Sequence, residues 1–380
     1  MRVAKMRLAR LVVVVVSATM FLPSTCVAWT STTRGASSIH HSKTTRLFNV
    51  PPPSAAADDP VALKTYANRE KPPASFYELQ INCARAAKLA MADGHLLLEI
   101  EFPPLAAKVL EMDDVSAYDV AAANLELAID FSKNLVQDGG GRNKVAILFP
   151  DEAELDIAAE KIGTRRPHPN IEISSLRKSK EGDDRLFKPE QVFLSLFGGG
   201  SGGTVQKMDD VDVYVCLVAS AQELPDIEEL HMLDPTKTIF FYNLKLDVLR
   251  GDLGAPAFPG KDFQDRFLSK VKPVYYLRTR QYTRNTPNPP FMVNYQGCLF
   301  RSYPGQFQTL LDTGMGSYRR VLGNDIRPAL GEFKEQLTQA LREEGVIAEE
   351  GNALKFLRTG YKTTTWWEEE RENASDAWRT

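Results

Sequence analysis

Two polar side chains directly follow short apolar runs, at positions where α/β proteins bind ligands. Asp151 comes just after residues 144–149 (KVAILF), and Asn243 just after residues 238–242 (TIFFY). Ligands of open α/β sheets bind in the crevice outside the carboxyl ends of the strands. If the two strands are neighbours, Asp151 and Asn243 share that edge and predict a small-molecule or nucleotide site. A structural alternative for Asp151 is favoured, because Glu154 three residues later is typical of a helix N-cap.

A glycine-rich stretch at residues 198–203 (GGGSGG) matches two chemical motifs by spacing. Its glycines fit the dinucleotide fingerprint, and Gly199, Ser201 and Gly203 fit the nucleophile elbow of hydrolases. Both motifs need a helix that opens on the last glycine, whereas residues 204–210 lead into another apolar run. A surface loop is therefore the favoured interpretation, and the sequence does not indicate its role.

A third group of chemically capable residues is basic and aromatic. It consists of Arg278, Arg280 and Arg284 among the tyrosines Tyr275, Tyr276 and Tyr282. Such a group can bind a phosphate, an acidic lipid headgroup or an acidic loop of a partner. The sequence therefore predicts a partner or anion patch, with a solvated strand end as the alternative.

Residues for metal chemistry are few and scattered. Beyond residue 57 the chain has three isolated histidines and three cysteines that are more than 80 residues apart: His95, His168, His231, Cys83, Cys216 and Cys298. A zinc site needs three or four convergent ligands, and paired-cysteine motifs are missing from this sequence. We therefore predict no metal site, no cofactor and no disulfide framework.

The elements that would position these residues alternate between strands and helices. Apolar runs at residues 95–102, 144–149, 211–218 and 238–242 predict buried parallel strands. Amphipathic patterns predict helices at residues 75–93, from residue 116 to the glycines at 139–141, at 151–162 and at 325–344. Residues 291–293 and 298–300 predict an antiparallel hairpin. The expected fold is α/β, a three-layer sandwich with a mostly parallel central sheet, helices on both faces and an antiparallel edge hairpin.

Two acidic residues interrupt the first of these runs. Glu99 and Glu101 alternate with Leu98, Ile100 and Phe102. This alternation predicts that the two carboxylates lie on a solvated face or form salt bridges to a covering helix.

The N-terminal region has the composition of a targeting sequence. Residues 1–28 combine a basic start, an apolar stretch of 12 residues and a small-residue cleavage site, as in a signal peptide. Residues 29–57 are rich in Ser and Thr and hold no acid, as in a transit peptide. This two-part leader predicts delivery to a plastid (chloroplast), in the stroma or associated with thylakoids. A secretory destination is the alternative, for which Asn373 would be a glycosylation site.

The remainder divides into a linker at residues 58–71, a single α/β domain at 72–345 and a loose C-terminal tail at 346–380. Residues 1–57 hold seven Lys/Arg and no Asp/Glu, so residues 58–380 carry 39 Lys/Arg against 49 Asp/Glu, a net charge of −10. An acidic body argues against a nucleic-acid-binding protein. Residues 58–380 contain no apolar run long enough to span a bilayer, so any membrane contact is expected to be peripheral.

Several of these stretches together resemble a known family. They are LLLEIEFPPL (96–105), VAILFPDEAE (145–154), VDVYVCLVAS (211–220), TIFFYNLKL (238–246) and PVYYLRT (273–279). Their order is similar to that of the uncharacterised plastid domain-of-unknown-function family nineteen-ninety-five, over about residues 72–344. The resemblance implies a plastid auxiliary protein that helps photosystem II assembly. It implies no catalytic residues, because none are established in the family.

Two functions from different classes follow. The first is a non-enzymatic plastid factor in photosystem II assembly or thylakoid complex accumulation, with photosystem II core or assembly proteins as partners. The second is a small-molecule or nucleotide-binding enzyme that uses the strand-end crevice near Asp151 and Asn243.

Overall fold

The structure is a computed structural model. It describes residues 59–110, 112, 114–137, 143–178, 203–249, 260–286, 289, 291–314, 317–347, 372 and 374–380. The two leader segments and nearly all of the glycine-rich stretch lie outside the described residues.

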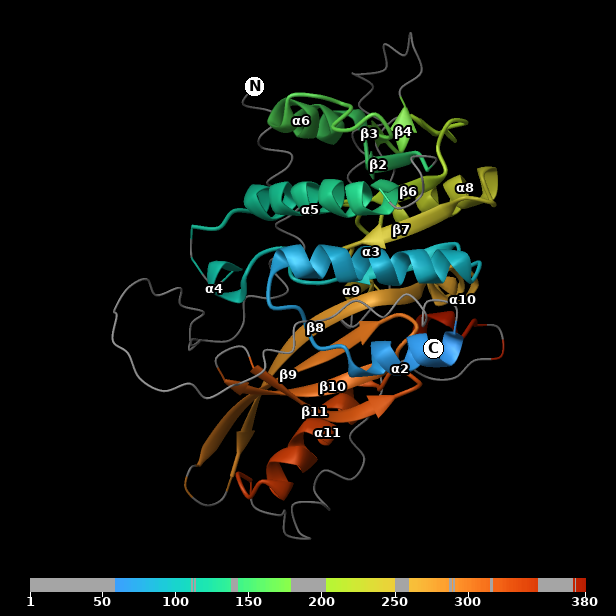
Figure 1. Cartoon of the computed structure of the whole chain (residues 1–380). Coiled ribbons are helices and arrows are strands. Elements are labelled where there is room, and N and C mark those ends of the chain that lie inside the picture. The colour runs from blue at the N-terminus through green and yellow to red at the C-terminus, as the bar shows by residue number, and fades with distance from the viewer. Residues whose placement is uncertain are drawn as a thin grey trace, which may run out of the picture.

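A sheet of nine strands forms the centre of the molecule (Figure 1). Its order is β11-β10-β9-β8-β1-β7-β6-β2-β3. The six strands from β8 to β3 run parallel. They are β1 (Leu97–Glu101), β2 (Val145–Phe149), β3 (Ile171–Ser175), β6 (Val213–Cys216), β7 (Thr238–Tyr242) and β8 (Lys272–Asn285). The expected α/β fold with a mostly parallel sheet is confirmed.

Helices cover both faces of the parallel part, so β1, β2, β6 and β7 are buried along their whole length. The helices α3 (Phe76–Ala92), α5 (Ala117–Gln137) and α6 (Glu152–Ile162) pack on one face. The short α4 (Ala107–Leu110) precedes α5. On the opposite face lie α8 (Leu224–Leu233), α9 (Leu246–Leu249), α10 (Lys261–Arg266) and the 3-10 turn η2 (Leu268–Lys270). This arrangement is the expected three-layer sandwich.

The antiparallel edge is larger than a hairpin. Strands β9 (Met292–Ser302), β10 (Phe307–Gly314) and β11 (Ser317–Asn324) continue the sheet beyond β8. The expected turn within residues 291–300 is wrong, because both halves belong to the continuous strand β9. Gly297 suggested a turn, but it lies where α11 (Leu330–Glu343) packs closest, against Leu337. A small residue is needed there for helix packing.

Helix α11 covers the antiparallel part and forms a third apolar cluster with β8, β9 and β10. The helix expected at residues 325–344 begins later, at Leu330. Pro328 explains the delay, because a proline disfavours helical backbone in the residue before it. A separate two-stranded ribbon pairs β4 (Arg177–Lys178) with β5 (Thr204–Val205).

Two boundaries differ from the sequence prediction. The expected linker at 58–71 contains α2 (Pro60–Arg69), and the next residue, Glu70, is buried and pairs with Arg85 at 2.5 Å. The expected loose tail ends in an ordered 3-10 turn, η3 (Ala377–Arg379), whose Trp378 is buried. Both segments therefore pack on the domain.

No helix among the described residues is both long and apolar enough to cross a membrane.

Candidate functional site

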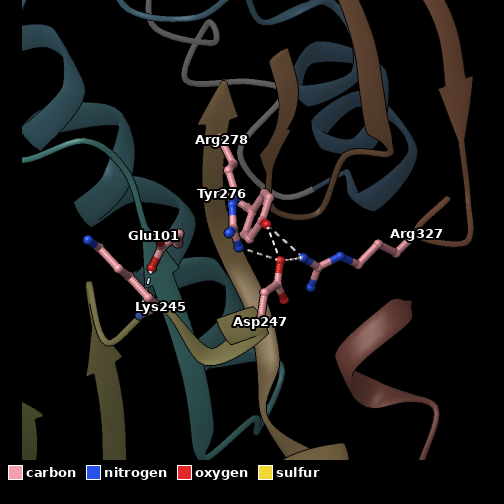
Figure 2. A network of polar contacts seen from close by, with 6 residues as sticks. All are labelled: Glu101, Lys245, Asp247, Tyr276, Arg278 and Arg327. Atoms are coloured by element: carbon pink, nitrogen blue, oxygen red, sulfur yellow. Dashed lines mark hydrogen bonds and ion pairs between the residues drawn. The ribbon is translucent and has the colours of Figure 1, made fainter. Parts of the chain in front are cut away.

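Charged side chains gather where β1 and β7 end and β8 passes beside them (Figure 2). Glu101 is the last residue of β1, and Asp247 lies in α9, five residues after β7 ends at Tyr242. Tyr276 and Arg278 stand two residues apart on β8, where Tyr276 is opposite Glu101. This is the carboxyl edge of the parallel strands, the edge at which α/β proteins bind ligands.

The carboxylate of Asp247 is the centre of this group. Its Oδ2 accepts a hydrogen bond from Tyr276 Oη at 2.6 Å. The same oxygen pairs with Arg278 at 2.8 Å and with Arg327 at 2.5 Å. Arg327 also donates to Tyr276 Oη at 2.7 Å, and its guanidinium lies 4.4 Å from the ring centroid. We call Asp247, Tyr276, Arg278 and Arg327 the Asp247 network.

The Asp247 network joins parts of the chain that are distant in sequence. Arg327 comes from the loop before α11, 80 residues after Asp247. Its backbone N–H donates to the carbonyl of Arg379 at 2.7 Å. The network thus fastens the β7–β8 crossover to the antiparallel part of the domain and to the C-terminal turn.

The surroundings of the Asp247 network favour the charged form of Arg327 and the neutral form of Tyr276. Burial lowers the pKa of Arg327, but Asp247 and Tyr276 outweigh this effect and raise it above its usual value. Burial raises the pKa of Tyr276 above its usual value, so its hydroxyl stays protonated and donates. Buried ion pairs of this kind need additional hydrogen bonds, and Asp247 Oδ2 accepts one from each of Tyr276, Arg278 and Arg327.

Glu101 lies beside the Asp247 network, and its carboxyl group has a raised pKa. Its carboxylate accepts a hydrogen bond from the backbone N–H of Lys245 at 3.1 Å. Burial, together with the charges of Glu99 and Asp247, raises its pKa to about 7, against the opposing effect of Arg278. A carboxyl with this pKa can take up or release a proton near neutral pH, which is what general acid–base catalysis requires.

Strained backbone also marks this edge. Val218, Asn243 and Lys245 have φ values of 60°, 53° and 52°, although none is glycine. All three lie within three residues of the ends of β6 and β7. Such conformations cost free energy and tend to gather at functional sites.

The sequence-predicted pair Asp151 and Asn243 does not lie on neighbouring strands, because β6 separates β2 from β7. Asp151 is the N-cap of α6, and its Oδ1 accepts from the Glu154 N–H at 3.0 Å, which confirms the structural interpretation. Asn243 Oδ1 accepts from the N–H of Phe102, and its Nδ2 donates to Asn124 Oδ1, both at 2.8 Å. A ligand-binding role for the two residues stays a prediction.

The three predicted arginines share one face of β8 but not one environment. Arg278 belongs to the Asp247 network, Arg284 is buried, and Arg280 is half-buried. They therefore do not form a simple solvated strand end. Their role as a partner or anion patch stays a prediction.

Sequence reasoning missed the centre of the site. Glu99 and Glu101 were expected on a solvated face or in salt bridges to a covering helix, but they are only 1% and 8% exposed. Glu101 instead bonds a backbone N–H of the loop after β7. Asp247 and Arg327 carried no local signal, because their partnership depends on strand order.

The described residues contain no group of three or more His, Cys, Asp or Glu that could hold a metal ion. The cysteines Cys83, Cys216 and Cys298 are all buried as free thiols.

The fold and these contacts define a class: a three-layer α/β protein whose parallel sheet is extended by antiparallel strands and fastened by a buried ion network. A comparison with family models matches residues 73–335 to the family described as Domain of unknown function (DUF1995). The chain belongs to this family, and the resemblance seen in the sequence is confirmed. In a comparison with curated proteins, no match was found.

Proposed function

We propose that this protein is a non-enzymatic plastid auxiliary factor that assists photosystem II assembly or the accumulation of thylakoid complexes. One structural observation carries the proposal. At the edge where α/β enzymes bind substrates, the polar groups of Asp151, Asn243 and the Asp247 network bond one another or nearby backbone. Groups used in this way support a rigid scaffold that presents its surface to partners.

The N-terminal leader and the family membership support the proposed location in the plastid. A signal peptide at residues 1–28 followed by a transit-like segment at residues 29–57 is suited to plastid import. The proposed partners are photosystem II core or assembly proteins, met in the stroma or at the thylakoid surface, with any membrane contact peripheral.

Affinity purification tests the proposal directly. A C-terminally tagged chain is purified from gently solubilised plastid membranes, and the co-purifying proteins are identified by mass spectrometry against an untagged control. Enrichment of photosystem II proteins is expected. Normal levels of photosynthetic complexes in a clean knockout would contradict the proposed role in assembly. A tagged protein found in the secretory pathway would contradict the proposed plastid location.

A second candidate function is an enzyme or binding protein for small molecules or nucleotides at the carboxyl edge. The strained residues Val218, Asn243 and Lys245 favour it, as does the pKa of about 7 at Glu101. Thermal shift with a panel of nucleotides and phosphorylated metabolites tests this candidate. A ligand-induced shift that Asp151→Ala weakens, but Asp151→Ser preserves, would reflect only the cap. A shift lost in both variants would support a role for the carboxylate, and no shift with any ligand would leave the candidate without support.

A further inference from the structure

The β8–β9 pair has two large apolar side chains at its free end. The strands pair from Tyr275 opposite Ser302 out to Asn285 opposite Met292. Phe291, just before β9, and Met292, the first residue of β9, are 66% and 58% exposed. In Figure 1 the pair runs to the lower left, away from the layer formed by α3 and α5. Two adjacent apolar side chains are therefore exposed at the end of a long two-stranded arm.

The charge of this arm is opposite to that of the body. Residues 275–302, which span the two paired strands, contain four Lys/Arg and no Asp/Glu, whereas residues 58–380 as a whole carry a net charge of −10. Among the described residues, no carboxylate lies within ion-pair distance of Arg280 on β8. Lys334 of α11 is exposed, and its Nζ lies 5.5 Å from the ring centroid of Tyr282. Positive charge is thus available at Arg280 and Lys334.

Two of the four acidic residues in and directly after α11 form ion pairs with arginines, and the other two, Glu332 and Glu343, accept hydrogen bonds from glutamines of the same helix. Glu335 pairs with Arg342 at 2.6 Å, and Glu344, the C-cap of α11, pairs with Arg319 at 2.8 Å. An anionic surface would attract the arm and repel the acidic remainder of the molecule, so charge alone would select one orientation.

The shape of the end favours a lipid surface over a peptide. Small ligands bind in pockets and peptides bind in grooves or along sheet edges, whereas Phe291 and Met292 are consecutive residues at the end of an arm. Apolar side chains on a protruding element, with cations behind them, are suited to the interface of an anionic bilayer. Long basic side chains can then reach the headgroups.

We propose that the free end of the β8–β9 arm is a membrane-docking element. It inserts Phe291 and Met292 into the interfacial region of an anionic bilayer, while Arg280 and Lys334 contact the headgroups. This inference uses the residues of the arm and α11, and it does not rest on the proposed plastid role.

A depth-sensitive fluorescence experiment tests the insertion itself. Phe291→Trp and the control Met232→Trp are made in the full chain, and the unmodified chain gives the background. Met232 lies on α8 and is 66% exposed, as is Phe291. With vesicles of phosphatidylglycerol and phosphatidylcholine that contain brominated lipid, quenching is expected at position 291 and not at position 232. Because the readout is local, a chain that bound through its N-terminal region would leave both positions unquenched, and that result would overturn the proposal.

Vesicle flotation measures how much the arm contributes. The paired variant Phe291→Asp/Met292→Asp is expected to bind at least about tenfold more weakly than the unmodified chain, because it loses two buried apolar side chains. Met232→Asp is the matched control and should bind normally. Arg280→Glu should weaken binding to phosphatidylglycerol vesicles, and the difference should shrink as salt rises. Binding to polyglutamate without binding to vesicles would assign the arm to an acidic protein partner and overturn the lipid proposal.

Discussion

At the residue scale, Asp247 is the shared partner of buried Arg327, half-buried Arg278 and the Tyr276 hydroxyl. Asp247→Asn removes the negative charge but keeps the shape, so it leaves Arg278 and Arg327 without their shared counterion. Breaking a buried ion pair in this way should cost about 3 kcal/mol of stability or more. Equilibrium urea denaturation measures the loss. Asp156→Asn is the control, because its ion pair with Arg165 is solvent-exposed and should change stability by less than about 0.5 kcal/mol.

Glu101 should make stability depend on pH in a predictable direction. Its pKa is raised from 4.5 to about 7 in the folded protein, so the fold binds its proton more tightly than the unfolded chain does. The stabilisation is full below about pH 4.5 and is lost as the pH rises through about 7. Glu154, whose pKa burial raises to about 8, contributes in the same direction.

The variant Glu101→Gln separates the contribution of Glu101 to the pH dependence of stability from the contributions of other titratable groups. The amide mimics the protonated acid and does not ionise, so the variant should lose less stability than the parent between pH 5 and pH 8. The expected difference at pH 8 is up to about 3 kcal/mol in favour of the variant. Denaturant midpoints measured across this range test it, with exposed Glu152→Gln as the control. Parallel pH profiles for the parent and Glu101→Gln would show that the carboxyl titrates normally.

At the element scale, the packing of α11 on β9 depends on Gly297. A Cβ at this position would collide with the Leu337 side chain and would lie 2.9 Å from the backbone oxygen of Leu310. The backbone of β10 at Leu310 cannot move away without disturbing its pairing with β9. Gly297→Ala should therefore destabilise the domain by about 2 kcal/mol. Gly260→Ala, where nothing lies within 4 Å of the new methyl group, is the control for thermal unfolding. Adding Leu337→Ala should not restore full stability, because the contact with the Leu310 oxygen remains.

The C-terminal turn is a second element whose contribution can be measured. Trp378 is 7% exposed, and the Thr380 oxygen accepts hydrogen bonds from Lys272 at 2.7 Å and Arg301 at 2.9 Å. Trp378→Ala should therefore cost about 3 kcal/mol, as expected for a buried aromatic side chain. Leu233→Ala, at a residue that is 45% exposed, should cost much less in the same denaturation experiment. Equal effects of the two substitutions would mean that the turn does not pack stably in solution.

At the scale of the whole molecule, the sequence predicted what depends on local pattern. Residues 238–242 form β7 with the expected bounds, and Asp151 caps α6 as its spacing with Glu154 indicated. Glu99 and Glu101 were misjudged because alternation suggests one solvated face, whereas helices cover both faces of β1. The ion pair between Asp247 and Arg327 could not be predicted, because it joins residues 80 positions apart through a strand order that no local pattern encodes.

The contacts predict a folding unit that extends beyond the residues matched by the family. The family match covers residues 73–335, but α2 and the C-terminal turn lie outside it and pack on the same domain. Gln308 Nε2 donates to the Glu70 carbonyl at 2.9 Å, and the Arg327 N–H donates to the Arg379 carbonyl at 2.7 Å. A chain of residues 59–380 should thus unfold in one cooperative transition and at a higher temperature than a chain of residues 72–345. Calorimetry of the two chains tests this, and equal transition temperatures would show that the flanking segments add no stability. Because Arg327 belongs to the Asp247 network, Asp247→Asn should lower the transition temperature less in the shorter chain, which has already lost the contact with Arg379.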